Sequence, residues 1–205
     1  PIRDKSNVSR KALNMAEQTP LRAQEAANWD FFLKLPHYDR RIAKRNTIPG
    51  SMLLPPLFEF SGACVGCGET PYIRLATQLF GDRMLVANAT GCSSIYGGNL
   101  PTTPYTTNAQ GRGPAWNNSL FEDNAEFGLG MRLATDKLAD AARTQLKAMA
   151  MEVGDAVVNA LLNADQTTEA GIHEQRERVA ALLVKLGHLA TPAAEQLAAV
   201  AEYLI

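Results

Sequence analysis

The composition of the chain changes sharply near residue 120, and this change limits the folds available to it. Residues 46–118 are rich in Gly, Pro, Thr, Asn and Cys and contain few stretches that could sustain a long helix. From Leu120 onward the chain is rich in Ala, Leu and Glu, and its apolar residues recur at three- and four-residue steps. A loop-rich segment is therefore followed by a helical one, within a length of 205 residues that suits one globular domain or a domain with an appendage.

The first part of the chain is predicted to contain an amphipathic helix and a basic connector. Apolar residues are spaced for a helix over residues 20–35, with Thr19 as its N-cap and Pro36 ending it. Four of the six residues in 40–45 are Arg or Lys. This run could be a nucleic-acid patch, but we expect a solvated connector.

The middle of the chain has the element order of an α/β fold. Residues 70–80 read as a short helix with Pro71 near its first turn. Residues 83–89 read as a buried strand that enters a turn at Gly91. A loop, a helix, a strand and a second loop therefore follow one another. We treat residues 99–118 as a loop and assign no catalytic residue to it.

The carboxyl-terminal part is predicted to be helical throughout. Apolar residues at helical spacing run from Leu133 to Leu161, and residues 165–168 offer a turn. A second helix is predicted over residues 169–186, and Thr191 begins a third as its N-cap. We expect these last two helices to form a helical hairpin appended to a sheet domain.

Charge and hydropathy exclude several classes of function. Lys and Arg total 20 against 21 Asp and Glu, so a net charge of −1 gives no overall field to attract nucleic acid or an anionic membrane. The apolar runs are far shorter than the roughly 20 residues that cross a bilayer, and the amino end lacks a secretory pattern. We therefore expect a cytoplasmic protein. The lack of an initiating Met and the apolar end at Ile205 lead us to expect an excised segment.

The three cysteines are the strongest chemical signal in the chain. Cys64 and Cys67 are three positions apart in a glycine-rich loop, and Cys92 follows the predicted strand. An odd number of cysteines makes a poor disulfide framework and favours ligand thiolates in a reducing compartment. A loop of this kind can aim sulfurs and backbone N–H groups at one centre, as iron–sulfur clusters require.

Spacing alone leaves other uses of these thiols open. A zinc site closed by a fourth ligand needs the same thiolates, and a C-x2-C pair also serves redox exchange or is inert. The histidines, which we expect to be ordinary surface or packing residues, are His37, His173 and His188. The rival hypotheses are a zinc-stabilised structural or interaction module and a helical binding module with incidental thiols.

Longer stretches of sequence resemble one enzyme family. The match is to the thiamine-diphosphate region of pyruvate:ferredoxin (flavodoxin) oxidoreductases, and its stretches are residues 11–15, 27–32, 57–72, 87–105 and 113–128. The resemblance implies an α/β fold, part of a thiamine-diphosphate-binding-like domain with the appended hairpin. It also divides the chain into three parts. Residues 1–50 would be a linker and helical lead-in that follow a ferredoxin-like domain, and residues 51–164 would be the amino-terminal part of the thiamine-diphosphate and [4Fe–4S] domain. Residues 165–205 would be a helical insertion.

The same resemblance implies roles for individual residues. Cys64, Cys67 and Cys92 correspond to ligands of the [4Fe–4S] cluster nearest thiamine diphosphate, and Glu69 and Cys92 correspond to residues lining the thiamine-diphosphate site. Glu69 also has a simpler reading, as a carboxylate favoured at a helix N-terminus. The family's Mg²⁺–diphosphate motif and fourth cluster cysteine do not occur in this chain, so we expect it to be inactive alone.

The implied reaction belongs to the whole enzyme. It takes pyruvate and coenzyme A to acetyl-coenzyme A and CO2, with ferredoxin or flavodoxin as electron acceptor. Its cofactors are [4Fe–4S] clusters, thiamine diphosphate and Mg²⁺. We expect the ligands of Mg²⁺ to lie mostly outside this chain. A homodimer and contacts with other domains of the same enzyme are also implied, and neither nucleic acid nor a membrane is an expected partner.

Overall fold

A computed structural model describes residues 2–3, 9–10 and 15–205, which divide into two units, Pro1–His37 and Tyr38–Ile205. The first unit contains an antiparallel pair, β1 (Ile2–Arg3) and β2 (Ser9–Arg10), and the helix α1 (Gln18–Leu33). The predicted lead-in spans residues 1–50, and its residues 1, 4–8 and 11–14 lie outside the described residues.

Helix α1 confirms the predicted helix but not its details. It begins after Glu17, whose side chain makes no cap hydrogen bond, so Thr19 lies inside the helix rather than at its N-cap. Its apolar residues are exposed, and no residue of α1 is buried. Trp29 and Phe32 instead stack on each other, with ring centroids 5.5 Å apart. The predicted apolar face is therefore present but covered by nothing within the described residues.

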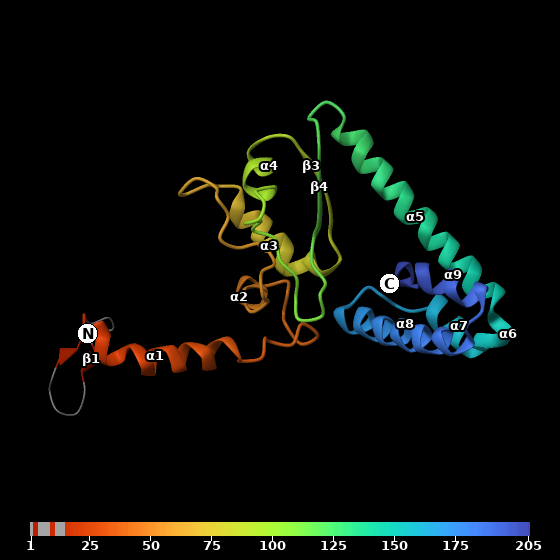
Figure 1. The fold of residues 1–205 in the computed structure, drawn as a ribbon, viewed down its shortest axis with the longest axis horizontal. Helices are drawn as coiled ribbons and strands as arrows, with labels where there is room; N and C mark the ends of the chain where they lie inside the picture. The colour runs from red at the N-terminus through yellow and green to blue at the C-terminus, as the bar shows by residue number, and fades with distance from the viewer. Residues whose placement is uncertain (1, 4–8, 11–14) are drawn as a thin grey trace. The chain divides into compact units, whose positions relative to one another are not determined.

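The second unit combines a small parallel sheet with many helices, as an α/β chain should (Figure 1). Its elements are α2 (Ile48–Met52), α3 (Thr70–Phe80), η1 (Gly81–Arg83), β3 (Leu85–Ala89), α4 (Cys92–Gly97), β4 (Ala115–Ser119), α5 (Asn124–Ala148), α6 (Ala150–Val153), α7 (Asp155–Leu162), α8 (Glu169–Leu189), α9 (Pro192–Val200) and η2 (Ala201–Leu204).

The strands β3 and β4 pair in parallel, and no other described strand joins them. Leu85 lies opposite Ala115 and Ala89 opposite Ser119. Two predictions fail here. The strand was expected to be buried and to include Arg83, but Leu85 is 54% exposed and Arg83 lies in η1. The second strand lies in a stretch that we treated as a loop, because its pairing partner is about 30 residues away in the sequence.

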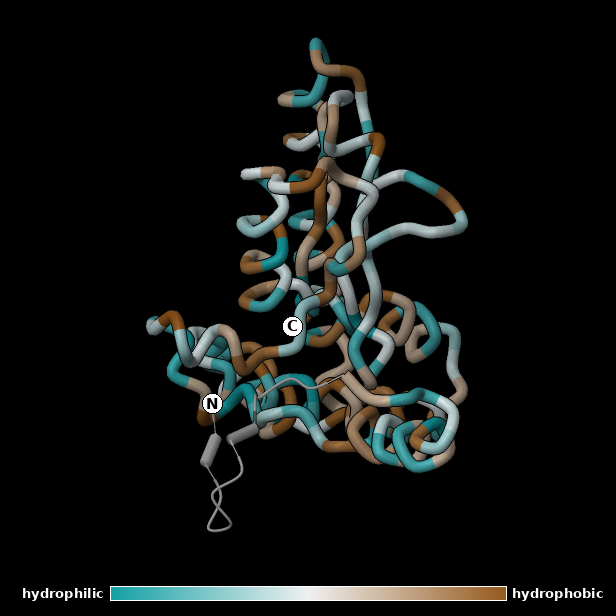
Figure 2. Tube along the Cα trace, turned by 90° about the vertical axis from the view of Figure 1, so that its left-hand side faces the viewer, coloured by the Kyte–Doolittle hydropathy of each residue, from teal (hydrophilic) through white to brown (hydrophobic). Residues whose placement is uncertain are grey.

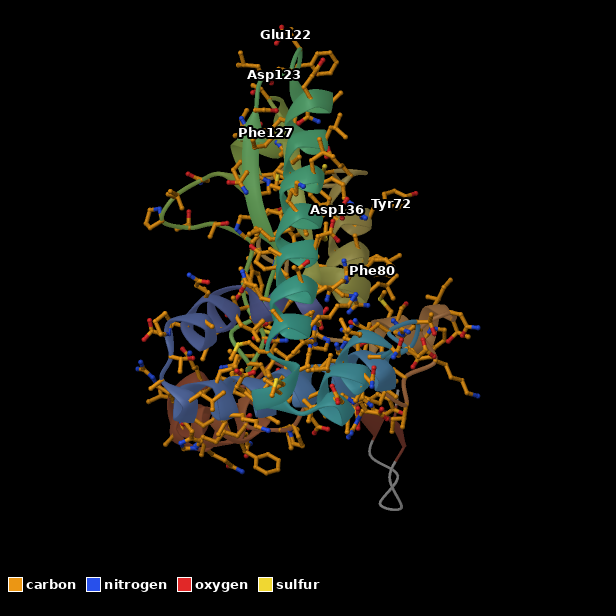
Figure 3. All side chains as sticks on the ribbon, turned by 90° about the vertical axis from the view of Figure 1, so that its right-hand side faces the viewer. Tyr72, Phe80, Glu122, Asp123, Phe127 and Asp136 are labelled. Carbon is orange, nitrogen blue, oxygen red and sulfur yellow. The ribbon has the colours of Figure 1, made fainter. Side chains whose placement is uncertain are left out.

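Helix α5 connects the sheet to the helices that follow. Figure 1 shows it running from the end of β4 to the group α6–α9. Its first half packs against β3, where a Cβ on Gly128 would lie 3.5 Å from the Ala87 side chain. Figure 3 shows Phe127 and Asp136 along this helix. The predicted continuous helix over 133–161 is broken at Met149 and at Gly154, whose φ of 96° lies in the region that favours glycine.

The main apolar core lies among the helices after residue 140. Figure 2 shows hydrophobic and hydrophilic stretches alternating along the tube, as amphipathic helices require. The core side chains come from α5 to η2 and are Ala142, Leu146, Met149, Val153, Val158, Leu161, Val179, Leu182, Leu186, Ala194, Leu197, Ala201 and Leu204. This core includes residues on both sides of the predicted boundary between residues 164 and 165, where the helical insertion was expected to begin. Thr191 is the N-cap of α9 as predicted, accepting from the backbone N–H of Ala194 at 3.2 Å.

A buried ionic cluster joins the helical part to the region of α3. The carboxylate of Glu169, at the start of α8, is 6% exposed and accepts from Arg45 at 2.6 Å, Arg83 at 2.9 Å and Arg40 at 3.2 Å. Arg40 also donates to the carbonyls of Gln78 and Leu79 at the end of α3. The prediction of a solvated connector over residues 40–45 is therefore wrong for Arg40 and Arg45, whose side chains are partly buried in this cluster.

None of the described helices combines the length and the apolar character needed to cross a membrane.

Candidate functional site

The first two cysteines lie on a tight turn just before α3. The backbone N–H of Cys67 donates to the carbonyl of Cys64 at 3.0 Å. Gly66 lies between them with a φ of 76°, a conformation that side-chain-bearing residues rarely adopt. Cys64 is exposed and Cys67 is partly exposed, and neither forms a disulfide. The turn therefore leaves both thiols available as ligands.

The start of α3 makes Cys67 a better thiolate. The backbone N–H groups of Glu69 and Thr70 donate to the Cys67 sulfur, and these hydrogen bonds lower the pKa of its thiol. Donors at a helix N-terminus favour the charged form of a sulfur in this way. Because the thiolate is the form that binds metals, the local structure prepares Cys67 for ligation.

Cys92 is the first residue of α4, directly beyond the carboxyl end of β3. The turn before it is held by the hydroxyl of Ser94, which accepts from the N–H of Gly91 at 3.1 Å. The same hydroxyl donates to Oδ1 of Asn118 at 2.8 Å, and Nδ2 of Asn88 donates to that oxygen at 2.9 Å. This polar network fixes the backbone around Cys92 at the end of the sheet.

Sequence reasoning missed Asn88, Ser94 and Asn118. The two asparagines are direct neighbours in the β3–β4 register, so their side chains meet across the sheet. No spacing rule could pair residues in two strands when the second strand was itself unrecognised. The nearest signal was the cluster of amide and hydroxyl residues around Cys92.

Trp116 on β4 packs closely against the end of α4. A Cβ added to Gly98 would lie 2.9 Å from Cη2 of Trp116, and one added to Gly97 would lie 3.2 Å from its Nε1. These distances are too short for ordinary packing at Gly98. The two glycines therefore let the indole reach the backbone and hold α4 against the sheet.

Glu69 lies beside an aromatic cluster. It is the N-cap residue of α3, as its simpler reading requires, but its side chain makes no cap hydrogen bond. Tyr96 on α4 is 3% exposed and packs edge-on to Phe58 at 5.9 Å, and Phe58 packs on Tyr105 at 5.0 Å. Burial, and then the neighbouring Glu69 carboxylate, raise the pKa of both tyrosines. The charge of Cys67 is a further, smaller cause of the raised pKa at Tyr96.

An open cavity of about 470 Å³ lies between α3 and residues 58–61. Its lining includes Phe58, Phe60 and Thr70, together with Arg74, which pairs with Glu59 at 3.4 Å. Figure 3 shows Tyr72, another lining residue, projecting from α3. The cavity borders the cysteine loop without including a cysteine or Glu69. The cysteines and Glu69 therefore lie outside the lining of this cavity.

The three cysteines do not converge on a single point. Among residues 2–3, 9–10 and 15–205, no three or more His, Cys, Asp or Glu side chains are close enough to hold a metal ion. His173 lies 3.7 Å from Glu177 on the exposed side of α8. The ligand roles of Cys64, Cys67 and Cys92 and the cofactor roles of Glu69 and Cys92 therefore stay predictions. The donor set itself, thiolates with backbone N–H donors, has the chemistry that an iron–sulfur cluster requires.

Comparison with known proteins relates the chain to one class of enzyme, 2-oxo acid oxidoreductases. No protein-family model matches it. The pyruvate-flavodoxin oxidoreductase of Nostoc sp. is 62% identical over 93% of this chain and 16% of its own length. That of Trichormus variabilis is 57% identical over the whole chain and 18% of its own length. The pyruvate:ferredoxin oxidoreductase of Moorella thermoacetica is 57% identical over 66% of the chain and 12% of its own length.

The chain belongs to the pyruvate-flavodoxin oxidoreductase family and corresponds to one segment of these enzymes. It spans less than a fifth of the length of the curated relatives that it matches. The resemblance predicted from the cysteine loop and its surroundings is thereby confirmed.

Proposed function

We propose that this chain supplies Cys64, Cys67 and Cys92 as ligands of a [4Fe–4S] cluster in a pyruvate oxidoreductase. The observation that carries the proposal is the tight turn in which the N–H of Cys67 donates to the carbonyl of Cys64 at 3.0 Å and both thiols stay free of disulfides. Backbone N–H groups of Glu69 and Thr70 also lower the pKa of the Cys67 thiol. Iron–sulfur clusters are held by thiolates, and backbone donors to the sulfurs tune their reduction potentials. The turn before α3 therefore has both features of a cluster-binding loop.

Glu69 and Cys92 are proposed to line a thiamine-diphosphate site next to this cluster. Support comes from the fold, because Cys92 follows the carboxyl end of a parallel strand, where open α/β sheets bind their ligands. When bound, thiamine diphosphate supplies an ylid that stabilises a carbanion. The chain's own contribution is to hold the Glu69 carboxylate at the start of α3 and the Cys92 turn at the end of β3. We propose that this α/β part belongs to a thiamine-diphosphate-binding-like domain.

The proposed reaction of the whole enzyme converts pyruvate and coenzyme A to acetyl-coenzyme A and CO2, with release of electrons to flavodoxin or ferredoxin. The names of the relatives support the substrate and the acceptors. We also propose that the enzyme is a cytoplasmic homodimer. Since the chain covers a small share of its relatives, the remaining cluster ligand and most of the Mg²⁺ ligands are proposed to come from parts of the enzyme outside this chain.

The test is to change Cys67 to Ser in the full-length oxidoreductase that contains this segment, purified without oxygen. We expect the loss of one cluster's share of iron and acid-labile sulfide, and a change in the electron paramagnetic resonance spectrum. The same change at Cys92 should give the same loss. His173→Ala is the matched control, because this side chain is exposed on α8 and lies 3.7 Å from Glu177 of the same helix.

Two results would contradict the proposal. Unchanged iron, sulfide and spectrum in both cysteine variants would exclude these residues as ligands. Stoichiometric zinc that is lost from the variants, with sulfide unchanged, would instead identify a zinc site.

A further inference from the structure

The side-chain amide of Asn118 is the centre of a hydrogen-bond network at the carboxyl end of the β3–β4 pair. Its Oδ1 accepts from the hydroxyl of Ser94 at 2.8 Å and from Nδ2 of Asn88 at 2.9 Å. Its Nδ2 donates to the hydroxyl of Thr90 at 3.2 Å, and that hydroxyl donates to the carbonyl of Ser119 at 2.7 Å. Both ends of the amide are engaged, so the Asn118 side chain is held in one orientation.

Ser94 links this amide to the turn that precedes Cys92. The hydroxyl of Ser94 accepts from the N–H of Gly91 at 3.1 Å, and the backbone N–H of Ser94 donates to the carbonyl of Gly91 at 3.1 Å. The Cys92 thiol itself is exposed and forms no disulfide. The network therefore holds the backbone on both sides of Cys92 and leaves the sulfur available.

The link between the turn and β4 depends on Asn118. The hydroxyl of Ser94 has one proton, and a second acceptor, the carbonyl of Ala89, lies 3.2 Å away in β3. Without the Asn118 amide, the hydroxyl would donate to Ala89 instead. The turn would then lose its side-chain connection to β4, and Nδ2 of Asn88 would lose one of its acceptors.

We propose that Asn118 is a positioning residue for Cys92, because through Ser94 it fixes the turn that presents the Cys92 sulfur to the [4Fe–4S] cluster. This inference rests on the proposed ligand role of Cys92. Groups that orient metal ligands without touching the metal commonly change metal affinity by about 10–100-fold. The cysteine pattern did not indicate Asn118, which reaches the turn only because β3 pairs with β4.

The experiment measures how fast iron leaves the full-length oxidoreductase, purified without oxygen, when a ferrous-iron chelator is added. Electron paramagnetic resonance follows the cluster signal that Cys92→Ser removes. The variants are Asn118→Ala, Ser94→Ala, Ser94→Thr and the double variant Asn118→Ala with Ser94→Ala. Asn117→Ala is the matched control, because Asn117 is the preceding residue of β4 and its exposed side chain points to the opposite face of the strand.

Asn118→Ala and Ser94→Ala should each speed the loss of this cluster about tenfold or more. The double variant should lose it no faster than Ser94→Ala alone, since Asn118 acts through Ser94. Ser94→Thr keeps the hydroxyl and should retain the cluster as the unmodified enzyme does, and so should Asn117→Ala. A merely structural role would instead make the effects of Asn118 and Ser94 add, and circular dichroism on the same samples would show unfolding at the rate of iron loss.

The other outcomes overturn the proposal in distinguishable ways. If Cys92→Ser removes the cluster but Asn118→Ala keeps it as firmly as Asn117→Ala does, Asn118 does not position Cys92 and the ligand role stands. Additive effects in the double variant, or cluster loss that only follows unfolding, lead to the same conclusion. If Cys92→Ser leaves every cluster signal unchanged, the ligand role of Cys92 and the role of Asn118 fail together.

Discussion

Replacing Glu169 with Gln removes a negative charge that three arginines share at the start of α8. Arg40, Arg45 and Arg83 all donate to this carboxylate, which is 6% exposed. Gln keeps the size of the side chain but not its charge. The variant therefore leaves three guanidinium groups close together, with less compensation than before.

The expected cost follows from burial. Removing one partner of a buried ion pair typically costs about 3–5 kcal/mol. The three arginine side chains are 22–28% exposed, so water screens part of the resulting repulsion. We expect the free energy of unfolding to fall by about 2–4 kcal/mol, which lowers the urea midpoint by roughly 1–2 M.

The assay is urea denaturation of the chain at pH 7, followed by far-ultraviolet circular dichroism for the helices and by tryptophan fluorescence. Glu174→Gln is the control on the same helix, because Glu174 is 60% exposed and pairs with Arg178, four residues away. Its loss should cost less than about 0.5 kcal/mol. If the free energy of unfolding of the Glu169→Gln variant lies within about 0.5 kcal/mol of that of the unmodified chain, the cluster does not stabilise the unit.

The pH dependence gives a second readout of the same cluster. Burial raises the pKa of Glu169, but hydrogen bonds and charge from Arg40 and Arg83 outweigh it, so the pKa is lowered from its ordinary 4.5. Burial also raises the pKa of Asp82, but the hydrogen bond and charge of Arg176 and the charge of Arg83 outweigh it, so this pKa is lowered as well. A lowered folded-state pKa gives stability that is present above the unfolded-state value and is lost as pH falls through the folded-state value. The unmodified chain should therefore lose more stability below pH 4.5 than the Glu169→Gln variant does.

Two further predictions concern local packing and capping. Gly98→Ala should lower the free energy of unfolding by about 1–3 kcal/mol, because the added Cβ would lie 2.9 Å from Trp116. Gly130 in α5 has open space around it, so the control Gly130→Ala should be neutral or stabilising by up to about 1 kcal/mol. Equal effects of the two changes in urea denaturation would contradict this contact. Thr191→Ala should cost about 1 kcal/mol by removing the N-cap of α9, and an unchanged thermal midpoint would show that the cap contributes nothing.

Features set by neighbouring residues were predictable from the sequence. Helix α3 has the predicted bounds, Thr70–Phe80, because Pro71 and the apolar spacing are local signals. The cap at Thr191 is equally local. The turn at Gly91 also follows the predicted strand, although the helix α4 that begins at Cys92 lies where the sequence predicted a loop. In each case the residues that decide the structure lie within a few positions of one another.

Features set by distant residues were not predictable. Strand β4 was missed because its hydrogen bonds come from β3, and the exposed side of β3 could not be inferred before its single described partner was known. The connector at residues 40–45 looked solvated because Glu169, which pairs with two of its arginines, lies more than 120 residues away.

The sequence by itself determined the family, the cysteine turn and the residues proposed to bind iron and thiamine diphosphate, because these reside in short, specific stretches. Only the tertiary structure decided which groups surround them. It joined Asn88 to Asn118 beside Cys92, and among the described residues it left the three cysteines apart. The physical reason is that ligand chemistry is carried by individual side chains, whereas their mutual positions depend on strand register and helix packing across the whole unit.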